Sequence, residues 1–271
     1  MKQENPTLQQ LLNSAGIKRR FEELLDKSAP SFVSSILTIV RSNSKLQDCS
    51  PNSILSAAGI AAALKLPINP SLGFAFIVPY KGQAQFQLGF KGFVQLAMRS
   101  GQYRTLNSGA VREGQIKEID FVTGEIIRGE KISDEIVGYV AYMELINGFK
   151  KSLYMTIEEL QAHAEKYSQS YAYDLRSKRK TSVWSTNFDA MAKKTVLKKL
   201  LSNFGIISID QQSAALATAL QADQAIITEE GFRYIDNESD GEEKIVPFSE
   251  VIDLPEVEEP LDKNDTEEKN D

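Results

Sequence analysis

Residues 72–103 predict two strands and a helix in one continuous stretch. Lys81-Gly82-Gln83 marks a tight turn between an apolar, aromatic segment and a second segment, 83–90, in which glutamine alternates with apolar residues. A period of two places the three glutamines on one face of a strand and the apolar side chains on the other. Such a hairpin has an apolar face that must be covered, so we expect an antiparallel sheet packed with helices.

The charge pattern around this hairpin is one-sided. No acidic residue lies between Asp48 and Glu113. Buried cations without partners are costly, so the basic residues of this interval are expected at the surface. The interval contains six of them: Lys65, Lys81, Lys91, Arg99, Arg104 and Arg112.

The same asymmetry divides the whole chain of 271 residues. The net charge is −6, yet residues 1–227 hold 27 basic and 20 acidic residues, whereas residues 228–271 hold 4 and 17. A basic body with an acidic tail is typical of proteins that bind a polyanion. The tail has few aliphatic residues and is predicted to be disordered. Its apolar patch at 245–254 is either a docking segment for a partner or a further strand.

Composition excludes several kinds of chemistry. Cys49 is the only cysteine and His163 the only histidine, which disfavours a disulfide, a zinc site and a Ser-His-Asp triad. No apolar run approaches the ~20 residues of a membrane helix, and the N-terminus does not resemble a signal peptide. We therefore expect a cytoplasmic protein with no catalytic residue, metal or cofactor.

Nucleotide-driven and metal-driven reactions lack their usual sequence signals. The phosphate-binding pattern G-x-x-x-x-G-K-[ST] does not occur, which disfavours ATP-dependent recombinase or helicase activity. The acidic residues of the body are scattered instead of clustered, as a magnesium-dependent nuclease would require. A metal-dependent nuclease or other DNA-modifying enzyme stays open as an alternative, and so does a phage structural or scaffolding oligomer.

The sequence predicts an α+β protein with four regions. Residues 1–66 are helical, and the small residues of 52–66 let a helix of the same chain or of another subunit approach closely, so this region is our candidate for oligomerisation. Residues 67–210 are expected to form the β-sheet and helix core that binds DNA. Residues 211–227 are a weak helix or linker, and 228–271 form the acidic tail.

Beyond residue 103 the pattern changes to strands. Asn147-Gly148 is a strong hairpin signal, and Thr156 with Glu159 forms a capping box that starts a helix extending to about Tyr167. The predicted strands cover residues 103–111, 116–122, 125–127, 136–146 and 150–155.

A second basic segment follows this helix. Residues 168–182 are rich in serine, tyrosine and cations, and we expect a surface loop. The helix predicted over 183–204 carries apolar residues on two opposite faces, with Lys194 and Lys198 one turn apart beside them. Two interpretations stay open. Either both faces pack into the core, or the edge with the two lysines meets a ligand.

These features suit sequence-independent binding of single-stranded DNA. Cations spaced along a groove neutralise phosphates, while amides and aromatic rings contact the strand without reading base edges. Twelve residues are candidates for DNA contacts: Lys81, Gln83, Gln85, Lys91, Arg99, Arg104, Arg112, Arg176, Lys178, Trp184, Lys194 and Lys198.

The chain resembles the RecT family of phage single-strand annealing proteins over most of residues 1–210. One dense match comprises Pro79-Tyr80-Lys81, Gln85-Phe86-Gln87, Gly89-Phe90-Lys91-Gly92 and Arg99-Ser100-Gly101; the other comprises Trp184, Asp189, Met191, Lys193-Lys194-Thr195 and Lys198-Lys199-Leu200.

The resemblance implies ATP-independent annealing of complementary strands in phage recombination, by an oligomeric ring or helical filament in the bacterial cytoplasm. It also implies a small twisted β-sheet with a helix packed on it. The implied partners are a phage-encoded exonuclease and the host single-stranded-DNA-binding protein.

On this basis we expect the two basic segments to form opposite walls of one groove. The first wall would carry Lys81, Lys91, Arg99 and Arg104. The second would carry Arg176, Lys178, Lys194 and Lys198.

Overall fold

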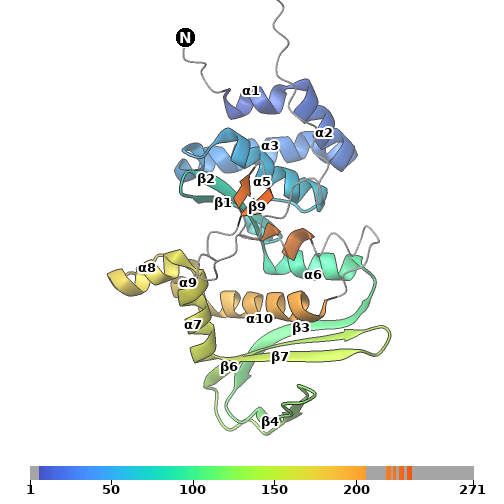
Figure 1. Cartoon of the computed structure of the whole chain (residues 1–271), viewed down its shortest axis with the longest axis vertical. Helices are drawn as coiled ribbons and strands as arrows, with labels where there is room; N and C mark the ends of the chain where they lie inside the picture. The colour runs from blue at the N-terminus through green and yellow to red at the C-terminus, as the bar shows by residue number, and fades with distance from the viewer. Residues whose placement is uncertain (1–5, 206–217, 221, 224–225, 229–230, 234–271) are drawn as a thin grey trace, which may run out of the picture.

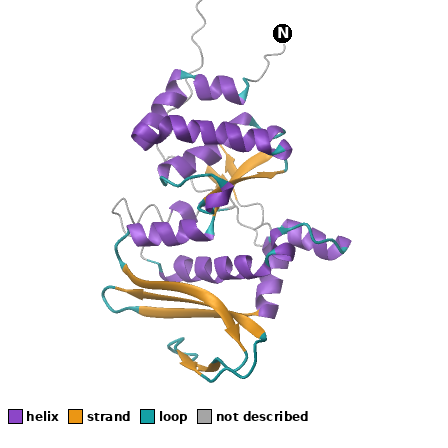
Figure 2. Ribbon diagram, turned by 180° about the vertical axis from the view of Figure 1, so that it is seen from behind, coloured by secondary structure: helices purple, strands orange, loops and turns teal. Residues whose placement is uncertain are grey.

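The computed structural model describes residues 6–205, 218–220, 222–223, 226–228 and 231–233. Figure 1 shows the N-terminal helices and a small hairpin at one end of the molecule, and a three-stranded sheet at the other. One long helix lies between them, and the view from behind in Figure 2 shows the same order of layers. The protein is a mixed α+β structure with small antiparallel sheets and a helical N-terminal region.

The N-terminal region is helical, as predicted. Its helices are α1 (Leu8–Asn13), α2 (Ala15–Leu25), α3 (Ala29–Ser42), α4 (Ser44–Gln47) and α5 (Pro51–Ala63). The small residues of α5 are fully buried: Ala57, Ala58, Ala61 and Ala62 are each 0% exposed. They pack within the same chain, where α5 contacts both strands of the hairpin and helices α1 and α2. The small residues could have packed against the same chain or against another subunit, and in this structure they serve packing within the chain.

The predicted hairpin forms from β1 (Ala75–Tyr80) and β2 (Gln83–Leu88). Lys81 and Gly82 connect them with positive φ angles of 45° and 78°, the backbone that a two-residue hairpin turn requires. The second strand ends two residues earlier than predicted, because Gly89 is the N-cap of α6 (Phe90–Arg99).

Two glycines let α6 pack tightly beside the hairpin. A Cβ atom at Gly89 would collide with the carbonyl oxygen of Gly73, and one at Gly92 would collide with that of Phe74 and approach the Leu88 side chain. The two glycines of the Gly-Phe-Lys-Gly motif are therefore needed for packing, because they let α6 lie against the backbone that leads into β1.

The main sheet consists of three antiparallel strands in the order β3 (Tyr103–Arg112), β6 (Ile136–Leu145) and β7 (Lys150–Thr156). All three were predicted, as was the turn at Asn147-Gly148. β4 (Ile116–Ile119) and β5 (Ile126–Arg128) pair separately. β4 is shorter than predicted because the Asp120 carboxylate accepts hydrogen bonds from the amides of Val122 and Thr123, which turns the chain.

The capping box predicted at Thr156 and Glu159 is present and starts α7 (Ile157–Tyr167). The prediction of a surface loop over residues 168–182 is wrong for the first part of this segment. That part forms α8 (Gln169–Ser177), with Ser168 as N-cap. The single helix predicted over 183–204 is divided at Asn187. This residue ends α9 (Val183–Thr186), and its side chain caps α10 (Phe188–Phe204).

Two hydrophobic cores meet on α10. The first contains the N-terminal helices, the hairpin and α6, and it includes Leu197 and Leu201 of α10. The second contains the inner face of the sheet with α7, α8 and α9, and it includes Ala192, Val196 and Leu200 of α10. Packing on both faces of this helix is therefore confirmed, and Figure 1 shows α10 between α6 and the sheet.

Little of the C-terminal region lies within the described residues. β8 (Ile226–Thr228) pairs with β9 (Gly231–Arg233), and β8 lies against β2 and α5. The tail predicted to be disordered thus contains a short strand, β9. Most of the weak helix predicted over 211–227, the rest of the tail and the patch at 245–254 lie outside the described residues. Where helices are described, none is long and apolar enough to cross a membrane.

We expect Gly92→Ala and Gly59→Ala to change stability in opposite directions. Both glycines are helical, but a Cβ atom at Gly59 meets nothing within 4 Å, whereas one at Gly92 meets backbone. Gly59→Ala should raise the free energy of unfolding by about 0.5–1 kcal/mol, because alanine loses less entropy in a helix. Gly92→Ala should lower it by about 1–3 kcal/mol through overpacking. Urea unfolding measures both, and equal effects would contradict the packing described for α6.

Candidate nucleic-acid interface

Two cations of the predicted first wall, Lys81 and Arg99, lie at opposite ends of α5. The turn that carries Lys81 lies at the start of α5, where the carbonyl of Gly82 accepts a hydrogen bond from the amide of Ser50 (2.9 Å). Arg99 lies at the other end, where its guanidinium donates to the carbonyl of Leu64 (2.7 Å). The 13 residues of α5 rise about 20 Å. Lys81 and Arg99 are therefore far apart, and Arg99 serves as a C-terminal cap of α5.

The two arginines of β3 form ion pairs within the chain. Arg104 lies 3.2 Å from a carboxylate oxygen of Glu144, and Arg112 lies 3.3 Å from one of Asp134. Both arginine side chains are partly exposed, so these pairs hold them only weakly. Lys91, in the first turn of α6, is exposed. Their expected contacts with DNA stay predictions.

The glutamine face of β2 is less open than its alternation suggested. Gln85 is only 8% exposed, and Gln83 and Gln87 are half-buried. β8 also lies close to β2. A contact between Gln85 and DNA stays a prediction that the burial of this side chain does not favour.

Lys194 and Lys198 of α10 face a buried carboxylate. The side chain of Asp223 is 0% exposed, and its oxygens lie 2.7 Å from Nζ of Lys198 and 3.7 Å from Nζ of Lys194. The backbone amide of Leu88 donates to the same carboxylate at 2.7 Å. Burial raises the pKa of Asp223, but the charges of both lysines and these hydrogen bonds outweigh it and lower that pKa below its usual value. The structure thus joins the end of β2 to α10, the two segments expected to face one another.

The four cations at the end of α8 project from a loop that one carboxylate organises. Asp174 is 2% exposed and accepts hydrogen bonds from the amides of Thr181 (2.9 Å) and Ser182 (2.7 Å). The hydroxyls of Thr181 and Ser185 donate to it as well, each at 2.7 Å. We call the segment Arg176–Lys180 the basic loop; its cations Arg176, Lys178, Arg179 and Lys180 are all exposed.

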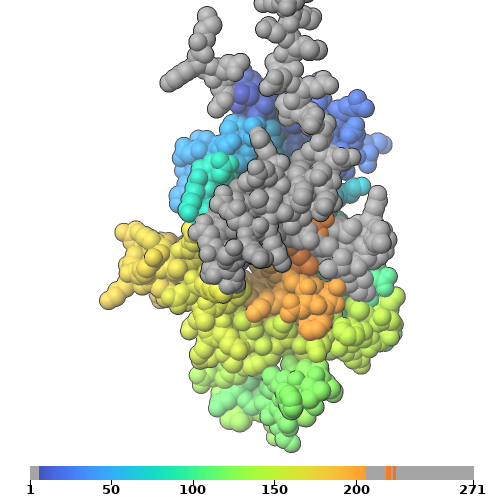
Figure 3. Space-filling view, viewed as in Figure 1, coloured from blue at the N-terminus to red at the C-terminus, as the bar shows by residue number. Residues whose placement is uncertain are grey.

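Hydrogen bonding dominates the charge state of Asp174. Burial raises its pKa, but the amide of Ser182 and the hydroxyls of Ser185 and Thr181 outweigh this effect and lower the pKa well below its usual value. The carboxylate is therefore charged at neutral pH and fixes the connection between α8 and α9. Figure 3 shows the α8 region projecting from one side of the molecule, where a long ligand can reach it.

Trp184, expected to contact DNA, is buried among aromatic side chains. It is 6% exposed, and its ring centroid lies 5.5 Å from that of Phe188 and 6.2 Å from that of Tyr171. Its ring faces the second core in this conformation. Stacking on a base stays a prediction that this arrangement does not favour.

The sequence did not reveal two features of this part of the molecule, and the first lies near α10. His163 of α7 has its pKa lowered to about 4, first by burial and then by the charges of Lys199, Lys198 and Lys166. No sequence pattern singled out Lys166 as a functional residue, because lysines are common near the ends of amphipathic helices. Cations from α7 and α10 therefore lie near this imidazole, which disfavours its charged form.

The second missed feature is the outer face of the main sheet. Strand register places Asn107, Tyr142 and Ser152 side by side, with Tyr154 one pair further on, on the face opposite α10. Figures 1 and 2 show the helices on the other side of this sheet and β4 beyond it. The irregular alternation of residues 136–146 did not reveal this polar and aromatic surface.

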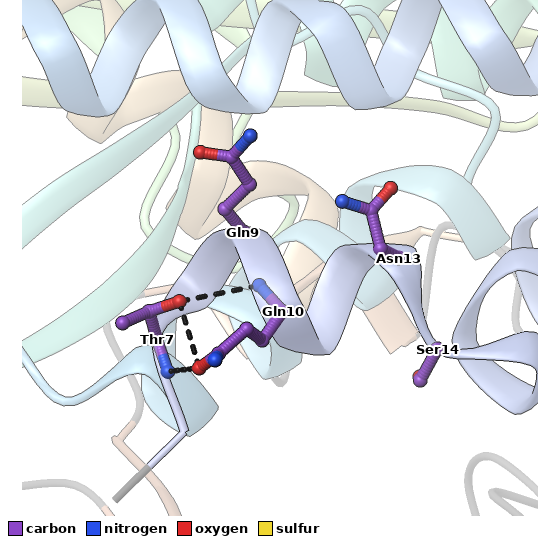
Figure 4. A pocket seen from close by; sticks show the side chains of 5 residues that line it. All are labelled: Thr7, Gln9, Gln10, Asn13 and Ser14. Atoms are coloured by element: carbon purple, nitrogen blue, oxygen red, sulfur yellow. Dashed lines mark hydrogen bonds between the residues drawn. The ribbon is translucent and has the colours of Figure 1, made fainter.

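A pocket beside α1 does not belong to this basic region. Figure 4 shows it lined by Thr7, Gln9, Gln10, Asn13 and Ser14, all of them uncharged, with the capping box of Thr7 and Gln10 at its edge. Among the residues that the structure describes, no three His, Cys, Asp or Glu side chains gather closely enough to hold a metal ion.

Comparison with known proteins gives a consistent result. Residues 30–242 match the model of the RecT family. The uncharacterized protein YqaK of Bacillus subtilis (strain 168) is 41% identical over 269 residues, which covers 98% of this chain and 84% of YqaK. Protein RecT of Escherichia coli (strain K12) is 24% identical over 246 residues, covering 83% of this chain and 87% of that protein.

We expect Asp174→Asn to lower the thermal unfolding midpoint by several degrees at pH 7, because the substitution removes the charged acceptor of four hydrogen bonds. The folded-state pKa of Asp174 is lowered, so its stabilisation is present above the unfolded-state pKa and is lost as the pH falls through the folded-state pKa. Unfolding curves between pH 7 and pH 2 should therefore show a smaller loss of stability on acidification in the variant. The matched control is Asp189→Asn, an exposed carboxylate paired with Lys193. An equal effect of both substitutions would contradict the role given to Asp174.

Proposed function

The chain belongs to the RecT family, and from this premise we propose that it binds single-stranded DNA and anneals complementary strands without ATP. The observation that carries the proposal is the family match itself, which spans the hairpin, the main sheet and α10. The structure supports it by packing the two most RecT-like segments, the hairpin with α6 and the helix α10, into one unit.

Exposed cations of the hairpin, of α6 and of the basic loop are proposed to hold the DNA backbone. Lys81 in the hairpin turn, Lys91 at the start of α6 and the basic loop are all exposed. Lysine and arginine side chains that neutralise phosphates release counterions, so the affinity should fall steeply with salt. Contacts of this kind leave the base edges unread, as an annealing protein that acts on any sequence requires.

Annealing follows from holding one strand by its backbone. A strand bound through its phosphates presents its bases to a complementary strand, and the bound cations reduce the repulsion between the two backbones. Neither step consumes a nucleotide. The energy of pairing comes from the DNA, and the protein raises the rate by aligning the strands.

We also propose that copies of the chain assemble on DNA as a ring or filament, since many weak sites in a row bind long DNA by avidity. Region 1–66 stays our candidate for this contact, although the small residues of α5 are used within the chain. The β4–β5 hairpin is a further candidate, because Phe121 is 96% and Val122 74% exposed. These two neighbouring apolar side chains form a continuous exposed surface, and such surfaces are typical of a contact with another protein when they are large.

The partners and setting proposed for this protein follow from the same premise. A phage-encoded exonuclease would supply single strands, and the host single-stranded-DNA-binding protein would compete for them in the bacterial cytoplasm. The acidic residues of 228–271 suit contact with a basic partner surface.

A fluorescence annealing assay with two complementary oligonucleotides tests the proposed function. Without any nucleotide triphosphate, the protein should accelerate pairing at low salt, and the acceleration should vanish as salt rises. Unchanged pairing rates would refute the proposal. Degradation of the DNA upon addition of Mg²⁺ would favour a nuclease, and assembly without DNA or acceleration would favour a scaffolding protein.

Removing two cations of the basic loop should weaken binding without unfolding the protein. For Lys178→Ala with Lys180→Ala we expect the slope of log K against log salt concentration to fall by about 1.4, since each contact on a single strand contributes about 0.7. Fluorescence anisotropy with an oligonucleotide measures this slope. The matched control removes two exposed lysines from the N-terminal helices, Lys18→Ala with Lys27→Ala. Equal slopes for both double variants would show that the basic loop does not contact DNA.

A further inference from the structure

A buried group of donors converges on Asp223, and its composition is that of an anion site. The ammonium groups of Lys198 and Lys194 lie 2.7 and 3.7 Å from the two carboxylate oxygens. The amide of Leu88 donates to the carboxylate from the end of β2 at 2.7 Å. Two cations one helical turn apart and one backbone amide therefore surround a single negative group.

The carboxylate fills this site as a phosphodiester would. Both groups carry one negative charge shared by two unesterified oxygens, and both accept hydrogen bonds from ammonium and amide donors. A backbone phosphate of DNA can therefore replace the Asp223 carboxylate without changing the charge of the site. Carboxylate and phosphate differ in shape, but lysine binds either one as a point charge.

The site lies where the proposed DNA-binding segments meet. Leu88 directly precedes Gly89, the N-cap of α6, and Lys194 and Lys198 belong to α10. Asp223 comes from a different part of the chain, a short segment after α10 that is described at 218–220 and 222–223. Two alanines of this segment, Ala219 and Ala222, pack into the first core. Leu220 of the same segment also packs against this core. The donors thus belong to the body, while the acceptor belongs to a separate short segment after α10.

Stability alone is a weak reason for such an arrangement. Burying the Lys194 ammonium group and the Asp223 carboxylate, with Lys198 partly exposed beside them, costs desolvation energy that their attraction only roughly offsets, and apolar side chains of similar size often stabilise a core better. Both lysines also lie within the region that matches the RecT family. A site that exchanges one anion for another gives these buried charges a function.

We propose that Lys194, Lys198 and the Leu88 amide form a binding site for a backbone phosphate of single-stranded DNA, which Asp223 occupies in the free protein. The inference rests on the proposed function and adds to it a named phosphate contact and its competitor. DNA displaces the segment that carries Asp223, so the apparent affinity is the intrinsic affinity multiplied by the fraction of molecules in which the site is open.

The test is Asp223→Asn, which removes the charge and keeps the side-chain size. Where the closed state outweighs the open state about tenfold, the variant binds an oligo-dT strand about tenfold more tightly than the wild type. Its slope of log K against log salt concentration stays that of the wild type, because both complexes contain the same phosphate contact and only the competing carboxylate has been removed. Fluorescence anisotropy over a salt series measures both quantities.

Asp189→Asn is the matched control. It removes one negative charge from α10 itself, but from an exposed ion pair with Lys193. Because exposed charges are screened by salt, we expect less than about a twofold change in affinity and no change in slope. Equal gains in the two variants, or unchanged or weaker binding by Asp223→Asn, would overturn the inference.

A measurement on the wild-type chain keeps the inference falsifiable if Asp223→Asn does not fold. Hydrogen exchange of the free protein should show protection both at Leu88 and in peptides that contain Asp223. Saturating oligo-dT should leave the Leu88 amide protected and increase exchange around Asp223. Unchanged exchange around Asp223 would overturn the inference. Wild-type protein that neither binds nor anneals DNA would instead refute the proposed function, so the two failures are distinguishable.

Discussion

The structure depends on a single helix that is buried on two sides. α10 contributes Leu197 and Leu201 to the core of the helical end and Ala192, Val196 and Leu200 to the core of the sheet. A helix with apolar residues on both faces cannot lie at a surface, because one face would remain in water. The two halves of the molecule are therefore held together by α10, and its lysines can only occupy the narrow edges between the cores.

This position divides the basic residues of the chain into two groups. Lys194 is 9% exposed and shares with Lys198 the carboxylate of Asp223, and Arg99 closes the end of α5. The hairpin turn, the start of α6 and the basic loop present their cations to solvent. The first group is tied to the folded chain, and the second meets a ligand without rearrangement. A protein that binds a polyanion and also packs two cores around a lysine-rich helix needs both groups.

An annealing protein has to hold DNA without holding it too tightly, since the duplex must be released. Exposed cations on long side chains supply many weak contacts whose sum depends on salt. A phosphate site at Lys194 and Lys198, occupied by the Asp223 carboxylate in the free protein, would add a stronger contact. This contact forms only when DNA displaces the carboxylate. The proposed function and the proposed role of Asp223 thus rest on one electrostatic principle, the exchange of one anion for another on fixed cations.

The amino-acid sequence by itself determined the elements whose cause is local. The turn at Lys81-Gly82, the hairpin at Asn147-Gly148 and the capping box of Thr156 were predicted because each depends on residues a few positions apart. The family membership was also visible in the sequence, through motifs in the hairpin and in α10.

Only the tertiary structure decided which charged and polar residues are accessible. α8 was missed because its end is fixed by Asp174, whose partners lie beyond the helix, and a serine-rich segment has no strong helical pattern. Gln85 and Lys194 were expected at a DNA surface and are buried, and Lys194 is paired with Asp223 from the C-terminal region. Burial and charge pairing arise between residues far apart in the chain, and no local pattern encodes such distances.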